Sequence, residues 1–450
     1  MTKQITVSNT RSGNPGQTGW NAILPPPLPA NILEENITTD WLVIGGGFAG
    51  LAAARRLSQL RPKDRTVLLE AIRIGDGPAG RSSGFMIDLP HDISTESYTG
   101  SFEADKKQTE MNRTALTFAK QAADDYDFSQ EVFDPRGKIN VAASDFGQKH
   151  NVEYAAYLSQ LEEPYSVLDA SDMKRITGTD YYAGGLYTPG SHMIQPAGFV
   201  RGVSRGLSHS GAVDIYENSP VLSMRQTGNT WLVQAPKGTV STPKIILAVN
   251  GHIQSFGYFK RRLMHIFLYA SMTRTLTPDE VKSLGGEAVW DAVPADPLGS
   301  TVRRISGLGG NRILVRNKFH YSRALEASEH HVERAARDHD RAFAARFPML
   351  PEVEMEYRWG GRLCLSWNSV PVFGEVETGV YAAVCQNGLG ASKGILSGLL
   401  AAEYATGTTN PYIHEYLNAD PPTRLPPEPF ATIGATAYLN WKERQAGREK

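Results

Sequence analysis

The chain contains only two cysteines in 450 residues, Cys364 and Cys385, which is too few for a disulfide framework and is typical of a reducing compartment. It also lacks any run of about 18 consecutive apolar residues, the length that a membrane-spanning helix requires. Its first 20 residues are polar and contain no apolar segment of the kind found in a Sec signal. We therefore expect a soluble, cytoplasmic protein without a membrane span.

Neither sign of charge is in excess, because 46 Lys and Arg residues stand against 47 Asp and Glu residues. This balance argues against nucleic acid or an acidic membrane as a partner. No zinc-ligand spacing, P-loop or Ser/His/Asp order is present, and we expect no bound metal. The chain is too long for one ordinary hydrophobic core, which predicts two domains.

The clearest feature that the sequence does contain is a glycine-rich stretch at residues 40–50. An apolar segment, Trp41–Ile44, leads into Gly45, Gly47 and Gly50, which have the spacing G-x-G-x-x-G, and a helical pattern follows at Phe48–Leu60. In this motif the first glycine permits a tight turn, the second lets the backbone approach a pyrophosphate, and the third lets the helix pack on the strand. The helix N-terminus then offers free N–H groups to the phosphates.

A second apolar strand, Thr66–Leu69, ends in Glu70, about 20 residues after the glycines. A carboxylate at this point can accept hydrogen bonds from a ribose. The glycine motif alone is weak evidence, but together with this strand and Glu70 it predicts a dinucleotide site. A glycine-rich turn without a ligand is the alternative interpretation.

Two further segments have small residues where a flat ligand could approach the backbone. The loop at Gly80–Gly84 contains a single arginine among small residues. Near the other end of the chain, an apolar strand at Val380–Cys385 is followed by Asn387-Gly388-Leu389-Gly390 and a helix at Ser392–Ala405. The second segment repeats the strand, glycine loop and helix order of the first, far away in sequence.

These segments together resemble the D-amino acid oxidase superfamily of FAD-dependent amine and amino-acid oxidoreductases, whose members include glycine oxidase, sarcosine oxidase and gamma-glutamylputrescine oxidase. The resemblance rests on Val43–Gly50 with Glu70, on Gly80–Gly84, and on Trp359–Arg362 through Val370–Gly374 to Asn387–Gly390. It covers about residues 38–408. The resemblance implies an α/β fold with an FAD-binding Rossmann-like domain (a parallel sheet plus an antiparallel meander) and an interleaved α+β substrate domain built on an antiparallel sheet.

The resemblance also implies which residues contact FAD. These fall in the two glycine loops, directly after the strand Thr66–Leu69, in the arginine loop, and in segments near residues 221 and 250: Gly45, Gly47, Phe48, Ala49, Gly50, Glu70, Ala71, Gly80, Arg81, Ser82, Ser83, Gly84, Val221, Asn250, Gly251, Asn387, Gly388, Leu389 and Gly390.

Three residues are candidates for the substrate pocket. Arg362 matches an arginine beside the substrate in glycine oxidase-like proteins, with an ion pair at the domain boundary as its alternative role. Lys393 follows the second glycine loop and could serve substrate, flavin or oxygen, or be structural. Tyr269 lies on a strand that could line the pocket or simply belong to the core.

The sequence departs from the family pattern at two positions, because Ser82 replaces the family's Asn after the arginine and Leu389 stands where some sarcosine oxidases have His. Cys364 lies near, but about two residues from, the cysteine to which sarcosine oxidases attach flavin covalently. We therefore expect FAD to be bound non-covalently, with Cys364 as a packed core residue.

The order of the segments predicts interleaved domains. The antiparallel strands of the substrate sheet are expected within 265–320, and long helices at 103–128, 148–163 and 327–347. The predicted parts are a Pro-rich N-terminal arm at 1–37; an FAD domain at 38–102, 165–255 and 359–408; a substrate domain at 103–164 and 256–358; and a Pro-rich tail at 409–450 that wraps the surface. The arm or the tail could join subunits of a homo-oligomer.

As function, the resemblance implies oxidation of the C–N bond of a small amine or amino acid by hydride transfer to flavin, with O2 or another acceptor reoxidising the cofactor. A hydroxy-acid dehydrogenase and a catalytically idle flavin-binding subunit are the alternatives. A pyridine-nucleotide reductase would need a second glycine fingerprint after a strand, and residues 184–211 and 285–310 do not contain one.

Overall fold

A computed structural model describes residues 3–10, 13–90, 101–296 and 298–450 of the chain. Its centre is a six-stranded sheet in the order β11-β4-β3-β15-β22-β21, parallel except for its last strand. The strands are β3 (Trp41–Ile44), β4 (Thr66–Leu69), β11 (Asp214–Tyr216), β15 (Lys244–Leu247), β21 (Val372–Glu377) and β22 (Val380–Val384). Every residue of β3, β4 and β22 is buried, as expected of parallel strands covered on both faces.

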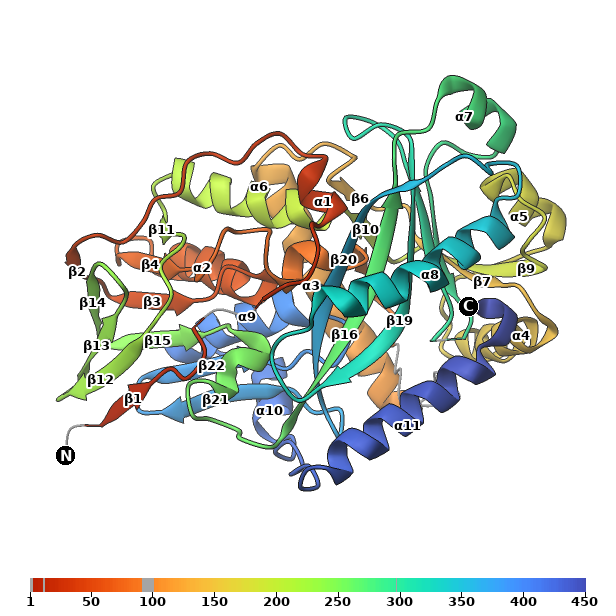
Figure 1. The fold of residues 1–450 in the computed structure, drawn as a ribbon. Helices are drawn as coiled ribbons and strands as arrows, with labels where there is room; N and C mark the ends of the chain where they lie inside the picture. The colour runs from red at the N-terminus through yellow and green to blue at the C-terminus, as the bar shows by residue number, and fades with distance from the viewer. Residues whose placement is uncertain (1–2, 11–12, 91–100, 297) are drawn as a thin grey trace.

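Helices cover one face of this sheet, and a second sheet covers the other (Figure 1). The helical layer contains α2 (Phe48–Leu60), α3 (Phe102–Asp125), α6 (Pro196–His209) and α9 (Ser392–Thr406). A Cβ added at Gly398 of α9 would lie 2.0 Å from the carbonyl oxygen of Ala49, so these two helices touch closely. The covering sheet has the order β1-β12-β13-β14-β2, with β1 (Gln4–Thr6), β2 (Asn36–Thr38), β12 (Ser223–Thr227), β13 (Thr230–Gln234) and β14 (Thr239–Thr242).

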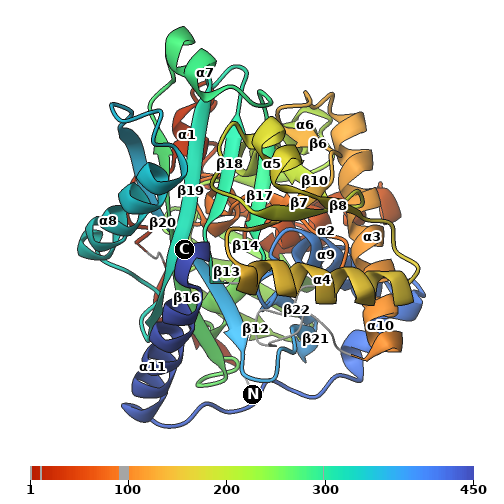
Figure 2. The same cartoon turned by 90° about the vertical axis from the view of Figure 1, so that its right-hand side faces the viewer.

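The other half of the molecule is an eight-stranded sheet with the order β20-β16-β19-β18-β17-β7-β9-β8, antiparallel except between β17 and β7. Figures 1 and 2 show its long strands running side by side, with α8 (Glu329–Arg346) across one face. The strands are β7 (Lys138–Ala142), β8 (Ser166–Leu168), β9 (Gly184–Thr188), β16 (Leu263–Thr273), β17 (Trp290–Pro294), β18 (Thr301–Ile305), β19 (Arg312–Ser322) and β20 (Met355–Ser366).

Smaller elements connect the two halves. A three-stranded sheet is formed by β5 (Phe85–Met86), β10 (His192–Ile194) and β6 (Phe133–Asp134). The remaining helices are α1 (Gly19–Ala22), α4 (Asp145–Gln160), α5 (Ala170–Thr177), α7 (Pro278–Leu284), α10 (Pro411–Leu417) and α11 (Phe430–Gln445), with 3-10 turns η1 (Pro78–Arg81), η2 (Asn250–Gln254) and η3 (Gly447–Glu449). Across the described part of the chain, no helix is both long and apolar enough to cross a bilayer.

The α/β fold class predicted from the sequence is confirmed, with its parallel sheet, its antiparallel meander and a separate antiparallel sheet. The helices expected at 103–128, 148–163 and 327–347 are present as α3, α4 and α8, with ends shifted by one to three residues. The domain boundaries stay a prediction, and strand pairing bears on one of them. Strands β8 and β9 fall in the segment assigned to the FAD domain, yet both belong to the eight-stranded sheet because β9 pairs with β7.

Both terminal segments pack on the body of the same chain. In the N-terminal arm, β1 pairs with β12 and β2 pairs with β14. The C-terminal tail, expected only to wrap the surface, forms α10, α11 and η3. The prolines of the tail lie at the N-terminal ends of α10 and α11 or in the connection between these helices, so they do not interrupt them. A homo-oligomer joined through either segment therefore stays a prediction.

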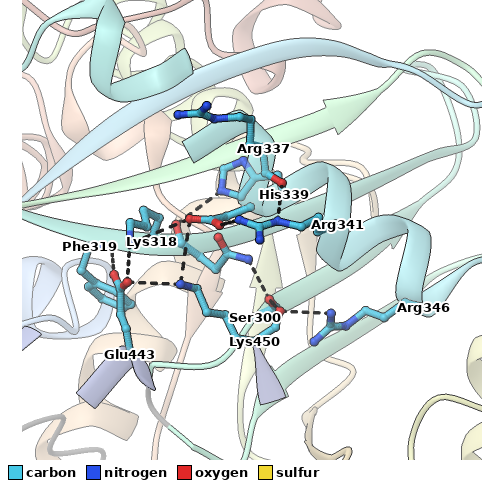
Figure 3. Close-up of polar contacts among 11 residues, drawn as sticks. Ser300, Lys318, Phe319, Arg337, His339, Arg341, Arg346, Glu443 and Lys450 are labelled. Atoms are coloured by element: carbon cyan, nitrogen blue, oxygen red, sulfur yellow. Dashed lines mark hydrogen bonds and ion pairs between the residues drawn. The ribbon is translucent and has the colours of Figure 1, made fainter. Parts of the chain in front are cut away.

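The end of the tail is fixed to β19 by buried charges (Figure 3). The Glu443 carboxylate forms an ion pair with Lys318 and accepts a hydrogen bond from the backbone N–H of Phe319 at 2.9 Å. The ammonium of Lys450 lies 3.2 Å from the same carboxylate, and Arg346 donates to the backbone oxygen of Glu449 at 3.0 Å. The Glu443 side chain is only 5 % exposed, so these contacts are shielded from water.

We predict that Glu443→Gln destabilises the protein by about 2 kcal/mol, because it removes the buried negative charge that pairs with Lys318 and leaves the ammonium only the more distant carboxylate of Asp338, at 3.8 Å. The matched control is Glu153→Gln on α4, which removes an exposed pair with Lys149 and should change stability by less than about 0.5 kcal/mol. Urea unfolding followed by circular dichroism measures both. Equal midpoints for the two variants would show that the tail contact contributes little.

Candidate active site

One cavity of about 330 Å³ lies between the parallel sheet and the eight-stranded sheet. It begins at the carboxyl ends of β3 and β4, passes the loop at 81–84 and the start of α9, and ends against β16, β18 and β19. Ligands in open α/β folds bind outside the carboxyl ends of parallel strands, so the position is the expected one. The cavity therefore joins the predicted dinucleotide site to the face of the antiparallel sheet.

Each of the three glycines between β3 and α2 has a different role. Gly45 has φ +107, and a Cβ there would lie 2.7 Å from the carbonyl oxygen of Ala248; a Cβ at Gly50 would lie 1.7 Å from the oxygen of Gly45. These two positions are thus required by the protein's own packing. Gly47 differs, because a Cβ there would approach only Ala79, at 3.6 Å, and would otherwise point into the cavity. The space at Gly47 is left for a ligand.

Glu70 lies at the end of β4 and lines the same end of the cavity. Its carboxylate accepts hydrogen bonds from the N–H of Gly46 at 2.7 Å and from the N–H of Ile72 at 3.1 Å. Burial nevertheless raises the pKa of Glu70 above its ordinary value, since the two N–H groups offset only part of the lost hydration. A ligand hydroxyl that donates a hydrogen bond to the Glu70 carboxylate would offset more of this lost hydration.

Arg81 holds the small-residue loop through its guanidinium group. It donates to the carbonyl oxygens of Asp76 (2.8 Å), Pro15 (3.1 Å), Gly16 (3.0 Å) and Gly360 (3.0 Å). These carbonyls belong to the loop itself, to the N-terminal arm and to β20. Burial lowers the pKa of Arg81 to about 10, so the group stays charged at neutral pH. Arg81 therefore fixes three segments at the wall of the cavity.

A second arginine holds the same loop from the antiparallel sheet. Arg303 of β18 forms a buried ion pair with Asp291 of β17, and it donates to the carbonyl oxygens of Ser83 at 2.8 Å and Ile194 at 2.9 Å. The Arg303 guanidinium also lies over the Trp20 ring, 5.0 Å from its centroid. The loop is thus held between the two halves of the molecule.

The start of α9 forms the opposite wall, and residues 388–391 line the cavity there. The side-chain oxygen of Asn387 accepts from the N–H of Ser366 at 2.8 Å, which fixes this turn against β20. Beside it, Gln386 is only 6 % exposed, and neither polar atom of its amide has a partner in the described part of the chain. The hydroxyl of Ser82 is also buried, and no described residue forms a hydrogen bond with it. Buried polar atoms of this kind normally have a hydrogen-bonding partner, so a polar ligand fits between them.

Comparison with known families matches the FAD dependent oxidoreductase family (DAO) to residues 40–404, most of the chain. The chain belongs to this family. The match includes β3, Glu70, the Arg81 loop and α9, and it confirms the resemblance seen in the sequence.

Individual relatives are distant but extend over nearly the whole chain. Gamma-glutamylputrescine oxidoreductase of Escherichia coli (strain K12) is 26 % identical over 429 residues, covering 92 % of this chain and 95 % of that protein. Probable oxidoreductase OrdL of Haemophilus influenzae is 26 % identical over 381 residues, covering 82 % and 83 %. The crystal structure of glycine oxidase from Geobacillus kaustophilus superposes with a TM-score of 0.69 at 17 % identity, covering 87 % of this chain and all of that one.

The described cavity fits FAD, the cofactor of this family. The open space at Gly47 and the N–H groups at the start of α2 suit a pyrophosphate, and Glu70 suits a ribose. The unpaired polar atoms of Ser82 and Gln386 lie further along, where a flat ring system could meet them. The residues present are therefore consistent with the family's cofactor.

The cavity brings together most of the residues that the sequence predicted to contact FAD. The following line it: Gly45, Gly47, Phe48, Ala49, Glu70, Ala71, Arg81, Ser82, Ser83, Gly84, Val221, Asn250, Asn387, Gly388, Leu389 and Gly390. Gly50, Gly80 and Gly251 do not, because each is packed against protein; a Cβ at Gly80 would lie 1.9 Å from the oxygen of Gly75, and one at Gly251 would lie 2.6 Å from the His265 ring. Direct cofactor contact stays a prediction for the first group.

The three candidates for the substrate pocket lie in different places. Arg362 lines the cavity, but its guanidinium donates to the backbone oxygen of Leu325. Tyr269 does not line the cavity, because it projects from the other face of β16 and packs with Val332 under α8. Lys393, in the first turn of α9, does not line it either. The cavity lining does not support the substrate role expected for Tyr269 and Lys393, and that role stays a prediction.

Several lining residues were not predicted from the sequence. Gln386 directly precedes the predicted loop Asn387–Gly390, so its position beside that loop could have indicated that it lines the cavity. Thr301 and Arg316 belong to β18 and β19, where only strand pairing shows which side chains face the cavity. Side chains alternate between the two faces of a strand, but this alternation places Thr301 and Arg316 side by side only when the register between β18 and β19 is known.

We predict that Gly47→Val abolishes FAD retention while the protein stays folded. The backbone at Gly47 has φ −86, which valine adopts without strain. The added side chain would occupy the space left for the ligand and would not clash with other protein atoms. Flavin absorbance per chain after purification, with far-UV circular dichroism, measures the two effects. Gly434→Val in α11, where a Cβ meets nothing within 4 Å, is the control and should keep its flavin. Full flavin content in Gly47→Val would refute this placement.

Proposed function

We propose that this protein oxidises the C–N bond of a small amine or amino acid, yielding an imine that water hydrolyses. FAD, when bound, supplies the acceptor for the hydride that leaves the carbon, and O2 or another acceptor then takes the electrons. The observation that carries the proposal is the single cavity that joins the dinucleotide-binding end to the antiparallel sheet. The similarity to a gamma-glutamylputrescine oxidoreductase and to a glycine oxidase supports an amine or an amino acid as substrate.

The residues of the cavity have separable roles in this proposal. The N–H groups at residues 388–391 and the dipole of α9 favour negative charge at that end of the cavity, and the free Gln386 amide can add a donor. The apolar side chains of Leu268, Val293 and Phe319 line the far end and limit access of water. Among the lining residues, His252 stays neutral at pH 7 because burial lowers its pKa to about 3.

Attachment of FAD is proposed to be non-covalent. Cys364 is fully buried at the cavity wall, and its hydrogen bond with Cys385, together with burial, raises the pKa of its thiol. The thiolate is the nucleophilic form of cysteine, so a thiol with a raised pKa is poorly suited to form a bond with the flavin.

Anaerobic reduction of the flavin tests the proposed function. A panel of amines, N-alkyl amino acids, polyamine conjugates and hydroxy acids is mixed with the purified holoprotein, and loss of flavin absorbance is followed. We expect bleaching by at least one amine or amino acid and by no hydroxy acid; admission of air then shows, through peroxide release, whether O2 accepts the electrons. Bleaching by hydroxy acids alone would indicate a hydroxy-acid dehydrogenase, and no bleaching by any compound would indicate a flavin-binding subunit; either result contradicts the proposal.

A further inference from the structure

The far end of the cavity contains a row of side chains from four neighbouring strands. Arg316 of β19 is paired with Ala270 of β16 on one side and with Thr301 of β18 on the other. Directly paired residues of antiparallel strands project from the same face of a sheet. Ala270, Thr301 and Arg316 all line the cavity, as do Val293 and Pro294 of β17. The row thus forms the floor opposite the cofactor-binding end.

Arg316 is a cation without an anion. In the described part of the chain its guanidinium makes no hydrogen bond or ion pair, and its one recorded contact is with the Phe319 ring, 5.8 Å from the centroid. Burial lowers the pKa of Arg316 to about 10, so it remains charged at neutral pH. A poorly hydrated charge is costly unless a partner of opposite sign approaches it.

Thr301 adds a second unsatisfied group next to this cation. Thr301 is 1 % exposed, and its hydroxyl has no hydrogen-bonding partner among the residues that the structure describes. A hydroxyl group can donate to an anion, and an arginine fork beside it matches the geometry of a carboxylate.

Within residues 3–10, 13–90, 101–296 and 298–450, no carboxylate lines this end of the cavity. Glu70 is the only acidic residue among the described residues that line the cavity, and it binds the N–H groups of Gly46 and Ile72 at the opposite end. Arg362 of β20 is offset by one residue from this row. It is paired with Phe267 of β16, whereas its neighbour Gly361 is paired with Leu268, which lines the cavity. Its guanidinium is also engaged by the carbonyl of Leu325.

We infer that Arg316 and Thr301 form the anion-binding end of the substrate pocket, so that the substrate is an amine or amino acid carrying a carboxylate, and not a polycationic amine. Arg316 takes over the anchoring role that the sequence suggested for Arg362. The assignment rests on the proposed function, since it places the acid group of the substrate of that reaction.

Binding of simple carboxylates to the holoprotein tests the assignment without any catalytic turnover. Acetate and benzoate are compared with acetamide and benzamide, their neutral counterparts of similar shape, through the perturbation of the flavin absorption spectrum. We expect each acid to bind at least about tenfold more tightly than its amide. Arg316→Met should weaken acid binding by about 10- to 100-fold and leave amide binding unchanged, because it removes charge-assisted hydrogen bonds but keeps an apolar side chain.

Two further variants complete the experiment. Thr301→Val should weaken acid binding less than Arg316→Met, and Arg337→Met, which alters an exposed arginine of α8, should change nothing. Should Arg316→Met fail to fold, Arg316→Lys replaces it, with a smaller loss expected because an ammonium lacks the fork. Equal binding of acids and amides, absence of acid binding, or a preference that survives in both Arg316 variants would overturn the assignment.

The outcome is distinguishable from that of the proposed function. Reduction by amines without any preference for acids would reject the anion site and keep the function. A preference for acids that depends on Arg316, with no bleaching by any amine, would keep the anion site and reject the function.

Discussion

The hydrogen bonds of the Arg81 guanidinium are the contact on which the rest of the site depends. Four carbonyl oxygens from the N-terminal arm, the 76–81 turn and β20 converge on this one group. Such carbonyls would be costly to bury without a donor, and arginine supplies several donors in a fixed fork. The loop that follows, Ser82–Gly84, can therefore line the cavity without collapsing into it.

Arg303 also binds several backbone carbonyls through its guanidinium, and it does so between the two halves of the molecule. It connects the Ser83 carbonyl and the Ile194 carbonyl to the buried Asp291 of the antiparallel sheet. The loop wall of the cavity and its antiparallel-sheet wall are thus joined by a charged group rather than by apolar packing alone. Two residues before Arg303, Thr301 lines the cavity, so the strand that fixes the loop also carries part of the floor. The C-terminal tail contacts the neighbouring β19 in a similar way, because its Glu443 forms an ion pair with Lys318 and accepts a hydrogen bond from the N–H of Phe319.

The cofactor end of the site was predictable because its determinants are local. Gly45, Gly47 and Gly50 act within a single turn, and Glu70 is separated from them by one helix and one strand. The substrate end was not, since it depends on the register of strands far apart in sequence. Tyr269 and Ala270 are adjacent, yet only Ala270 faces the cavity. Positive φ at Lys318 accompanies the shift in register that places Arg316 and Phe319 on one face. Helix α11 was missed because prolines directly precede it and its sequence has no clear apolar stripe.

The most direct test of this account is the affinity of Arg81→Lys for FAD. Lysine keeps the charge but cannot reach four carbonyls at once, so we predict at least about tenfold weaker FAD binding, by equilibrium titration of the apoprotein, with unchanged far-UV circular dichroism. Unchanged affinity and full flavin content in Arg81→Lys would contradict the claim that this guanidinium organises the cofactor site.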